Sequence, residues 1–519
     1  MQRVAAALIL LALGCGTDDT APAPAPAPET GLPFPKGFLF GTAVAGFQVD
    51  MGCPTLPAAE CDDTHSDWYA FITAPELQKD ATTYLAGDPP SAGPGQWELY
   101  AEDIERARTE LSNNGMRFSF EWSRIFPTAT DDAKDDTALA ALADPKAVAH
   151  YHAMLKALKD SGITPLVTLN HYSLPTWIHD GVGCHKDLKA CSPKGWVDKE
   201  RTVREIARYA GFCAREFGAE VDLWATENEP FAVIFPGYIQ PTPDRTNPPA
   251  VPLALAEAKI VFAALIEAHA RMYDAVKAGD TGDADGDGKA SMVGLVYSMS
   301  PVKAKDPEKP ADVQAAKNVW YLWNMAFLNA VAKGDFDGEL DGTATHRDDL
   351  AGRMDYIGIN YYTRITVEGL DSSILPDLSP LATFNPLTLQ PWEDYPRGLY
   401  EMALVVKDEL HLPAYITENG AADPLDDGTE PRSLVQHMTW LQRAITEGAD
   451  VRGYFVWSLM DNYEWNHGMS IRMGLYAVDK NDTTKARKPR QGVAVYASIA
   501  SMGRISDELQ AKYPIDPGK

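Results

Sequence analysis

The sequence is short of positive charge and of long hydrophobic runs. Its 46 Lys and Arg residues stand against 73 Asp and Glu, which gives a formal net charge of −27. Proteins that bind nucleic acid need a basic surface to neutralise phosphates, so we expect no nucleic-acid partner. The apolar run from Val4 to Leu13 is too short to span a bilayer, and no later run is long enough. The sequence therefore excludes a membrane-spanning helix.

Cysteine is also scarce, with 6 residues in a chain of 519. Cys53 and Cys61 lie close together in one expected loop, and Cys184 and Cys191 lie close together in another. In an exported protein such pairs form local disulfides. Metal binding is the alternative, but no His–Cys spacing supports it. Cys213 falls on the apolar face of an expected helix, which indicates a buried, unreactive thiol.

The N-terminus has the features of an export signal. Arg3 precedes the apolar run, and residues 11–15 (LALGC) resemble the lipobox of bacterial lipoprotein signal peptides, in which the Cys is lipidated. We therefore expect a signal peptide over 1–14, lipidated Cys15 with an Ala/Pro-rich tether over 15–31, and a catalytic domain over 32–519. The chain is then exported and anchored to a bacterial membrane, at the outer membrane or the periplasmic face, through this lipid alone. An ordinary secreted protein is the alternative.

Short apolar runs alternate with amphipathic stretches from about Phe38 onward. Helical spacing of apolar residues predicts helices over Ala147–Lys159, Thr202–Phe217, Leu253–Lys277 and Leu434–Thr446. Eight strands are expected, over Phe40–Ala45, Met116–Phe120, Thr164–Leu169, Leu223–Asn228, Met292–Ser298, Tyr356–Asn360, Ala414–Glu418 and Gly453–Trp457. Alternation of strands and helices indicates an α/β protein with a parallel sheet.

A closed barrel fits this alternation better than an open sheet. No glycine-rich dinucleotide fingerprint follows the first strand, which disfavours the open, doubly wound alternative. Polar motifs sit where the expected strands end, which is the active-site edge of a barrel. We therefore predict a (β/α)8 TIM barrel that forms a single catalytic domain with long loop insertions.

Two of these strand ends carry a glutamate. Glu229 ends the stretch 224–229 (WATENE), and Glu418 ends 415–418 (YITE). Cleavage of a glycoside with retention needs a pair of carboxyl groups, one to protonate the leaving oxygen and one to attack the anomeric carbon. Glu227 is also acidic, but strand alternation directs it away from Glu229, so a structural role is expected.

The motifs together resemble glycoside hydrolase family 1 from about Phe34 to Tyr496. Residues 67–69 (DWY) and 121–122 (EW) are most similar to the archaeal-type β-glycosidases of that family. The matching pieces, in order, are residues 38–43 (FLFGTA) with Gln48, 117–119 (RFS), 122–127 (WSRIFP), 170–171 (NH), 228–230 (NEP), 360–363 (NYYT), 417–420 (TENG) and 457–465 (WSLMDNYEW).

The resemblance implies a role for each matching residue. Glu229 is the general acid/base, Glu418 is the nucleophile, and Arg117 and Tyr362 contact the nucleophile. The other implied positions are Asn228 at the sugar 2-hydroxyl, Asn360 as a catalytic support, Gln48, His171, Glu464 and Trp465 at the other hydroxyls, Trp457 as the floor under the sugar, and Trp392 on the leaving-group side. The alternative for the histidine and the tryptophans is a purely structural place in the core.

The implied activity is that of a retaining exo-β-glycosidase that works by double displacement and needs no cofactor. Its substrates are a small or oligomeric β-glycoside, as a glucoside, galactoside or fucoside, and water. Glu464 stands where members that cleave 6-phosphorylated sugars have Ser, and a carboxylate repels phosphate. Tyr172 and Met473 depart from the residues common at their positions, which leaves the preferred sugar open. The alternative function is a non-catalytic, membrane-tethered carbohydrate-binding protein on the same barrel.

An acidic loop stands apart from the barrel motifs. Asp283, Asp285 and Asp287, followed by Gly288, have the spacing of the first ligands of an EF-hand-like calcium loop. Position twelve is Gly294, so the usual bidentate glutamate is missing. Calcium binding and an ordinary acidic surface turn both remain open.

Overall fold

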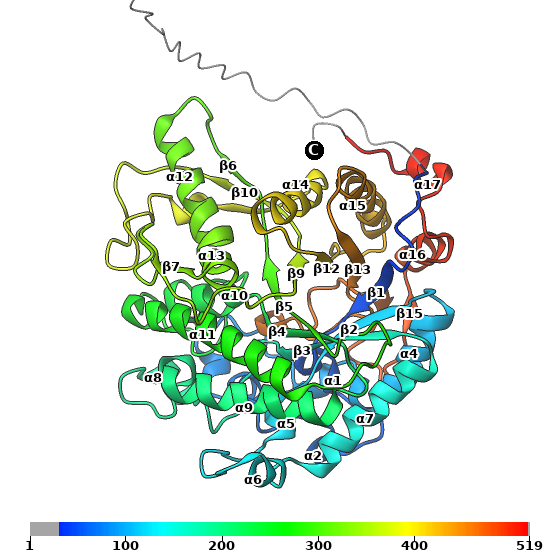
Figure 1. Ribbon diagram of the computed structural model, residues 1–519, viewed down its shortest axis with the longest axis horizontal. Helices are drawn as coiled ribbons and strands as arrows, with labels where there is room; N and C mark the ends of the chain where they lie inside the picture. The colour runs from blue at the N-terminus through cyan, green and yellow to red at the C-terminus, as the bar shows by residue number, and fades with distance from the viewer. Residues whose placement is uncertain (1–30, 517–519) are drawn as a thin grey trace, which may run out of the picture.

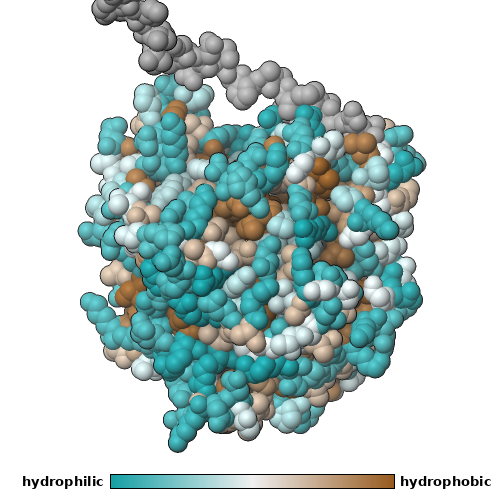
Figure 2. Space-filling model, viewed as in Figure 1, coloured by the Kyte–Doolittle hydropathy of each residue, from teal (hydrophilic) through white to brown (hydrophobic). Residues whose placement is uncertain are grey.

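The computed structural model describes residues 31–516, except for the side chains of residues 390 and 391. The predicted signal peptide, Cys15 and nearly all of the tether lie outside the described residues. No helix within 31–516 is long and apolar enough to cross a membrane. On the face shown in Figure 2 the surface is mostly hydrophilic.

Eight parallel strands close into a barrel at the centre of the molecule, with helices around it (Figure 1). Around the ring the order is β1, β13, β12, β9, β5, β4, β3 and β2, and β2 pairs again with β1. The strands are β1 Leu39–Ala43, β2 Gly115–Ser119, β3 Thr164–Asn170, β4 Leu223–Asn228, β5 Met292–Ser298, β9 Tyr356–Asn360, β12 Ala414–Asn419 and β13 Val451–Trp457. The predicted TIM barrel is confirmed.

Side chains fill the inside of the barrel. Tyr356, Tyr415, Phe455 and Trp457 are the aromatic members of a buried apolar cluster to which β1, β3, β4 and β5 also contribute. The Tyr356 hydroxyl donates to the carbonyl oxygen of Trp224 at 2.9 Å, so the one polar group of that side chain is satisfied. A packed interior leaves the C-terminal edge of the barrel as the place for polar side chains.

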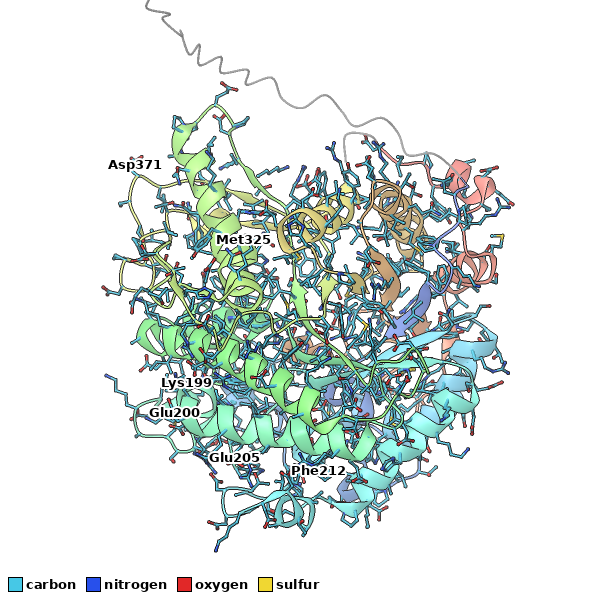
Figure 3. The ribbon with its side chains drawn as sticks, viewed as in Figure 1. Lys199, Glu200, Glu205, Phe212, Met325 and Asp371 are labelled. Atoms are coloured by element: carbon cyan, nitrogen blue, oxygen red, sulfur yellow. A yellow bond between two sulfur atoms is a disulfide. The ribbon has the colours of Figure 1, made fainter. Side chains whose placement is uncertain are left out.

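The helices that alternate with the strands cover the outside of the barrel. They begin near the residues that the apolar spacing predicts: α7 Pro145–Asp160, α9 Lys199–Phe217, α11 Leu255–Gly279 and α15 Thr429–Thr446. Asp144 caps α7 by accepting from the backbone N–H groups of Lys146 and Ala147. Helices α9 and α11 lie against each other, and Glu205 and Phe212 mark the course of α9 in Figure 3.

The predicted long insertions follow the strands at the C-terminal edge. Two of them together form a small sheet from β6 Val302–Ala304, which follows β5, and β10 Arg364–Val367 and β11 Gln390–Glu393, which follow β9. Strand β1 is shorter than predicted and ends at Ala43, because the short helix α1 (Gly46–Asp50) begins almost at once.

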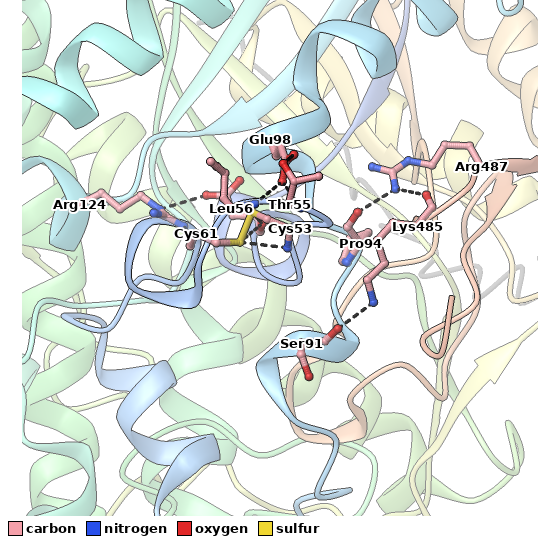
Figure 4. The surroundings of a disulfide bond; sticks show 11 residues. Cys53, Thr55, Leu56, Cys61, Ser91, Pro94, Glu98, Arg124, Lys485 and Arg487 are labelled. Atoms are coloured by element: carbon pink, nitrogen blue, oxygen red, sulfur yellow. Dashed lines mark hydrogen bonds and ion pairs between the residues drawn. A yellow bond between two sulfur atoms is a disulfide. The ribbon is translucent and has the colours of Figure 1, made fainter. Parts of the chain in front are cut away.

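Both expected cysteine pairs are bonded. Cys53 joins Cys61 and Cys184 joins Cys191. Figure 4 shows the first bond, beside Arg124, whose Nη2 donates to the carbonyl oxygen of Cys61 at 2.7 Å. Cys213 is a free, buried thiol in α9, and burial raises the pKa of its thiol far above the usual range. It is the unreactive side chain that the helical spacing predicts.

Candidate active site

The predicted site residues meet at the C-terminal edge of the barrel. Strands β3, β4, β9 and β12 end at Asn170, Asn228, Asn360 and Asn419. All four asparagines are buried, and parallel strands in a closed ring bring them to one mouth.

Glu418, the predicted nucleophile, is held by a cation and a phenol. Arg117 donates from Nη1 to Glu418 Oε1 at 2.6 Å, and the Tyr362 hydroxyl donates to Oε2 at 2.7 Å. Burial raises the pKa of the Glu418 carboxyl to about 7, against the Arg117 charge and the Tyr362 hydrogen bond, which lower it. Both contacts favour the ionised carboxylate, which is the form that attacks.

Arg117 joins several strands through one guanidinium. Besides its ion pair with Glu418 on β12, its Nη2 donates to Asn228 Oδ1 at 2.7 Å and its Nε donates to Thr168 Oγ1 at 3.0 Å. The side chain is fully buried, so its charge depends on these partners. The Arg117 guanidinium therefore fixes Glu418 relative to the residue that precedes Glu229.

Glu229, the predicted acid/base, has only neutral hydrogen-bond donors. It follows the last residue of β4 with a left-handed φ of 42°. Its Oε1 accepts from Asn360 Nδ2 at 2.9 Å, and its Oε2 accepts from the Tyr172 hydroxyl at 2.7 Å. None of the basic side chains in the described structure forms an ion pair with Glu229. Its environment therefore differs in charge from that of Glu418.

One wall of the mouth is made of polar side chains. Gln48 Nε2 donates to Glu464 Oε2 at 3.1 Å, and Arg245 Nη1 donates to Glu464 Oε1 at 3.4 Å. Gln48 Oε1 and His171 Nδ1 are buried and have no hydrogen-bond partner within residues 31–516. Buried polar atoms of this kind need a partner, and sugar hydroxyls would supply one.

Aromatic rings line the same wall. The rings of Trp457 and Trp465 each stack on His171 with centroids 6.0 Å away. Burial lowers the pKa of His171 well below its usual value, and the charges of Arg117 and Arg245 add to the effect, so the ring is neutral. Trp457 and Trp465 are almost fully buried, but they lie at the mouth rather than among the outer helices.

Trp392 lies further out. Its side chain is 65% exposed, and its ring centroid is 6.3 Å from that of Tyr362. Its place on the leaving-group side stays a prediction.

Sequence reasoning missed Arg245 and gave no role to Tyr172. The guanidinium of Arg245 lies over the rings of Tyr172 and Trp465, at 5.1 and 5.3 Å from their centroids. It comes from the irregular segment between η4 (Phe235–Ile239) and α11, where no periodic pattern marks a site residue. The signal for Tyr172 was its departure from the family's common residue.

Glu227 makes no contact with the catalytic groups. It is 1% exposed, and neither carboxyl oxygen has a hydrogen-bond partner in the part of the chain that the structure describes. Burial raises the pKa of Glu227 well above its usual value, so this side chain is a neutral acid inside the protein.

In the acidic loop, the carboxylates that lie close together are not the three that the sequence spacing predicts. Carboxylate oxygens of Asp283, Asp285 and Asp222 lie within 4.8 Å of one another, and Asp287 is not part of that group. Asp283 already accepts from the backbone N–H groups of Gly286 and Gly288. Calcium binding at this loop stays a prediction.

The barrel and its two unequal glutamates define the class of protein. A buried carboxylate with an ion pair, beside a carboxyl group with neutral donors only, is the arrangement that a double displacement at a sugar requires. The molecule is a retaining β-glycosidase.

Comparisons with known proteins lead to the same class. Residues 31–504 match the family model "Glycosyl hydrolase family 1", and the chain belongs to that family. It is 35% identical to a β-galactosidase of Pyrococcus woesei, over 92% of this chain and 99% of that protein. It is 29% identical to β-glucosidase A of Thermotoga maritima, over 91% and 99%. The crystal structure of a β-glycosidase from Thermosphaera aggregans superposes with a TM-score of 0.80 at 30% identity, covering 93% of this chain and 100% of that one.

Proposed function

We propose that the protein releases the terminal sugar of an unphosphorylated β-glucoside or β-galactoside, with Glu418 as nucleophile and Glu229 as acid/base. The observation that carries the assignment is the asymmetry of their partners. Arg117 forms an ion pair with Glu418, whereas Glu229 is held by an amide and a hydroxyl. The group beside the cation is the better candidate for the permanent carboxylate.

The reaction then proceeds in two displacements. An oxygen of Glu418 attacks the anomeric carbon, the bond to the leaving oxygen breaks, and Glu229 gives that oxygen its proton. In the second step Glu229 takes a proton from water, the water oxygen attacks the anomeric carbon, and Glu418 leaves as a carboxylate. Both residues return to their starting protonation state, so no cofactor is consumed.

The pocket wall supports the proposed sugar class. Glu464 presents a carboxylate whose two oxygens are held by Gln48 and Arg245. Such a carboxylate can accept hydrogen bonds from two neighbouring sugar hydroxyls. The 4- and 6-hydroxyls of a hexose are neighbours of this kind. The Glu464 carboxylate repels a 6-phosphate. Arg245 weakens this repulsion, but its charge is already paired with Glu464. The proposal includes both glucosides and galactosides, because the named relatives are a β-galactosidase and a β-glucosidase.

A panel of aryl β-glycosides tests the substrate. We expect hydrolysis of p-nitrophenyl β-glucoside and β-galactoside, weaker cleavage of the fucoside, and none of the 6-phosphoglucoside. Faster cleavage of the phosphorylated sugar would overturn the proposed role of Glu464.

A second experiment tests the nucleophile. Glu418→Gly should abolish turnover of an activated aryl glycoside, and added azide should restore part of it by forming the α-glycosyl azide. Glu227→Gly is a matched control, because that glutamate contacts no catalytic group. Wild-type activity in Glu418→Gly would show that the nucleophile is another residue. The alternative of a non-catalytic sugar-binding barrel would instead be favoured by a wild-type protein that binds sugar but releases no product.

The proposed location rests on the N-terminal sequence alone. We expect the full chain, expressed in a bacterium with an outer membrane, to sediment with membranes and to incorporate labelled palmitate. Cys15→Ser should remove the label and move the enzyme to the soluble fraction. An unlabelled wild-type protein found in the medium would favour the secreted alternative.

A further inference from the structure

Tyr172 lies between two catalytic side chains at the end of β3. Its hydroxyl oxygen is 2.7 Å from Glu229 Oε2 and 2.7 Å from Asn228 Nδ2. The side chain is 4% exposed, and the residue has a left-handed φ of 72°. This backbone conformation is uncommon for a residue other than glycine, and the surrounding contacts must maintain it.

The hydrogen-bond inventory fixes the direction of both contacts. An amide nitrogen such as Asn228 Nδ2 can only donate, so the Tyr172 oxygen accepts from it. The single phenolic proton is then free to be donated to Glu229 Oε2. Burial raises the pKa of Tyr172 well above its usual value, and the charge of Glu229 adds to this, so the phenol keeps its proton.

The other oxygen of Glu229 has a donor as well. Asn360 Nδ2 donates to Oε1 at 2.9 Å. When Glu229 loses its proton to the leaving group, each carboxylate oxygen therefore already faces a donor. A tryptophan, common at this position in the family, has an indole N–H that only donates and could not accept from Asn228 in the same way.

We propose that Tyr172 is a third catalytic residue, whose hydroxyl stabilises Glu229 as the carboxyl group gives up its proton. The inference rests on the proposed role of Glu229 as the acid. A hydrogen bond to a group that becomes charged strengthens during the step, so it lowers the barrier rather than only binding the substrate. The effect must be largest when the leaving oxygen needs that proton most.

Leaving-group dependence tests this role. For Tyr172→Phe we expect kcat/KM on an alkyl β-glucoside to fall about 10- to 100-fold, the range for losing one hydrogen bond to a charged group. On 2,4-dinitrophenyl β-glucoside, whose leaving group departs without a proton, the same variant should lose less than about threefold. Tyr172→Leu, which also lacks a hydroxyl, should show the same difference between the two substrates.

One control variant and the pattern of losses decide the result. Tyr297→Phe removes a buried hydroxyl that donates to the Trp323 carbonyl oxygen, away from the catalytic groups, and should change neither substrate. Equal losses on both substrates for Tyr172→Phe would mean a positioning role only and would overturn the proposal, as would no loss on either. A wild-type enzyme that cleaves neither glucoside nor galactoside would instead contradict the proposed function itself. If Tyr172→Phe fails to fold, as judged by its melting temperature, Tyr172→Leu decides the question alone.

Discussion

Two opposing influences act on the Glu418 carboxyl. Burial disfavours its charge, while the Arg117 guanidinium and the Tyr362 hydroxyl favour it. The free enzyme must hold Glu418 ionised to react, so activity is expected to fall as the pH falls through the pKa of this group, about 7. The two polar contacts therefore set the acidic limit of the working range.

Tyr362→Phe should move that limit. The variant removes a hydrogen bond that stabilises the carboxylate, so the pKa of Glu418 rises further and the acid limb of kcat/KM moves to higher pH. We expect a shift of about one pH unit, which corresponds to about 1.4 kcal/mol. The measurement is the pH profile of kcat/KM on an aryl glycoside.

Tyr356→Phe is the control for this prediction. It removes a buried hydroxyl at the start of β9, the strand that ends two residues before Tyr362, and this hydroxyl donates to a backbone carbonyl inside the barrel. Its acid limb should match that of the wild type. An unmoved limb in Tyr362→Phe would show that the phenol does not stabilise the charge of Glu418.

At the scale of elements, β4 leads into the proposed acid/base, Glu229, and carries an unusual neighbour of it. Thr226 bonds to His269 on α11, Asn228 bonds to Arg117, and Glu227 between them has no partner in the described structure. Burying a carboxyl group without a partner costs about 1–3 kcal/mol. The strand therefore tolerates a destabilising residue next to its catalytic end.

Glu227→Leu should stabilise the protein in a pH-dependent way. Glu227 is neutral in the fold and ionises in the unfolded chain above its ordinary pKa of 4.5. Its contribution to stability is thus full below that value and is lost as the pH rises. We expect the melting temperature of the variant to exceed that of the wild type at pH 7, with the gap narrowing towards pH 4 to the cost of burying the neutral carboxyl group alone.

A paired buried glutamate provides the contrast. Glu205 on α9 is also fully buried, but its carboxylate contacts Arg204, Arg208 and Thr130. Glu205→Leu should lower the melting temperature at pH 7, because it leaves these partners without their acceptor. If Glu227→Leu behaves like Glu205→Leu, Glu227 has a partner that its surroundings do not reveal.

The elements also show what sequence could and could not predict. All eight barrel strands were expected within about two residues, because buried runs in a parallel sheet are almost continuously apolar. The polar site residues at the strand ends could be predicted because each one follows such an apolar run directly. Arg245 was missed because its segment has no periodicity, and its position depends on packing against Tyr172 and Trp465. Trp465 was expected at the sugar, but its burial against Phe47 and Trp68 shows that it belongs to the core as well.

At the scale of the whole molecule, the two disulfides stabilise different places. Cys53 and Cys61 follow α1, the helix that carries Gln48, and both sulfur atoms lie near the Asp50 carbonyl oxygen, at 3.6 and 3.5 Å. Asp50 also forms a buried ion pair with Arg124 at 3.2 Å. The first disulfide thus supports the segment that bears a predicted sugar ligand.

Removing each disulfide in turn should show which bond affects only the free energy of unfolding and which also affects KM. The closed loops are short, with sequence separations of 8 and 7, so each bond contributes about 2.5 kcal/mol to the free energy of unfolding by chain entropy. Cys53→Ala/Cys61→Ala should in addition raise KM by up to about tenfold, the effect of one weakened hydrogen bond to the sugar.

The second pair is the matched control. Cys184→Ala/Cys191→Ala should lower the melting temperature to a similar extent and leave KM unchanged. A KM that does not respond to loss of Cys53–Cys61 would show that α1 keeps its place without the bond.

The closure of the barrel has a consequence for how the protein comes into being. Strand β1, the first strand of the chain, pairs with β13, the last strand of the ring, and Tyr496 near the C-terminus donates to the Gly41 carbonyl oxygen at 2.7 Å. A ribosome has therefore made almost the whole polypeptide before β1, which pairs with β2 early in the chain, can also pair with β13. A prematurely terminated product would expose two unpaired strand edges, which invite aggregation. We therefore expect a chain that stops before β13 to aggregate or be degraded rather than to be partly active.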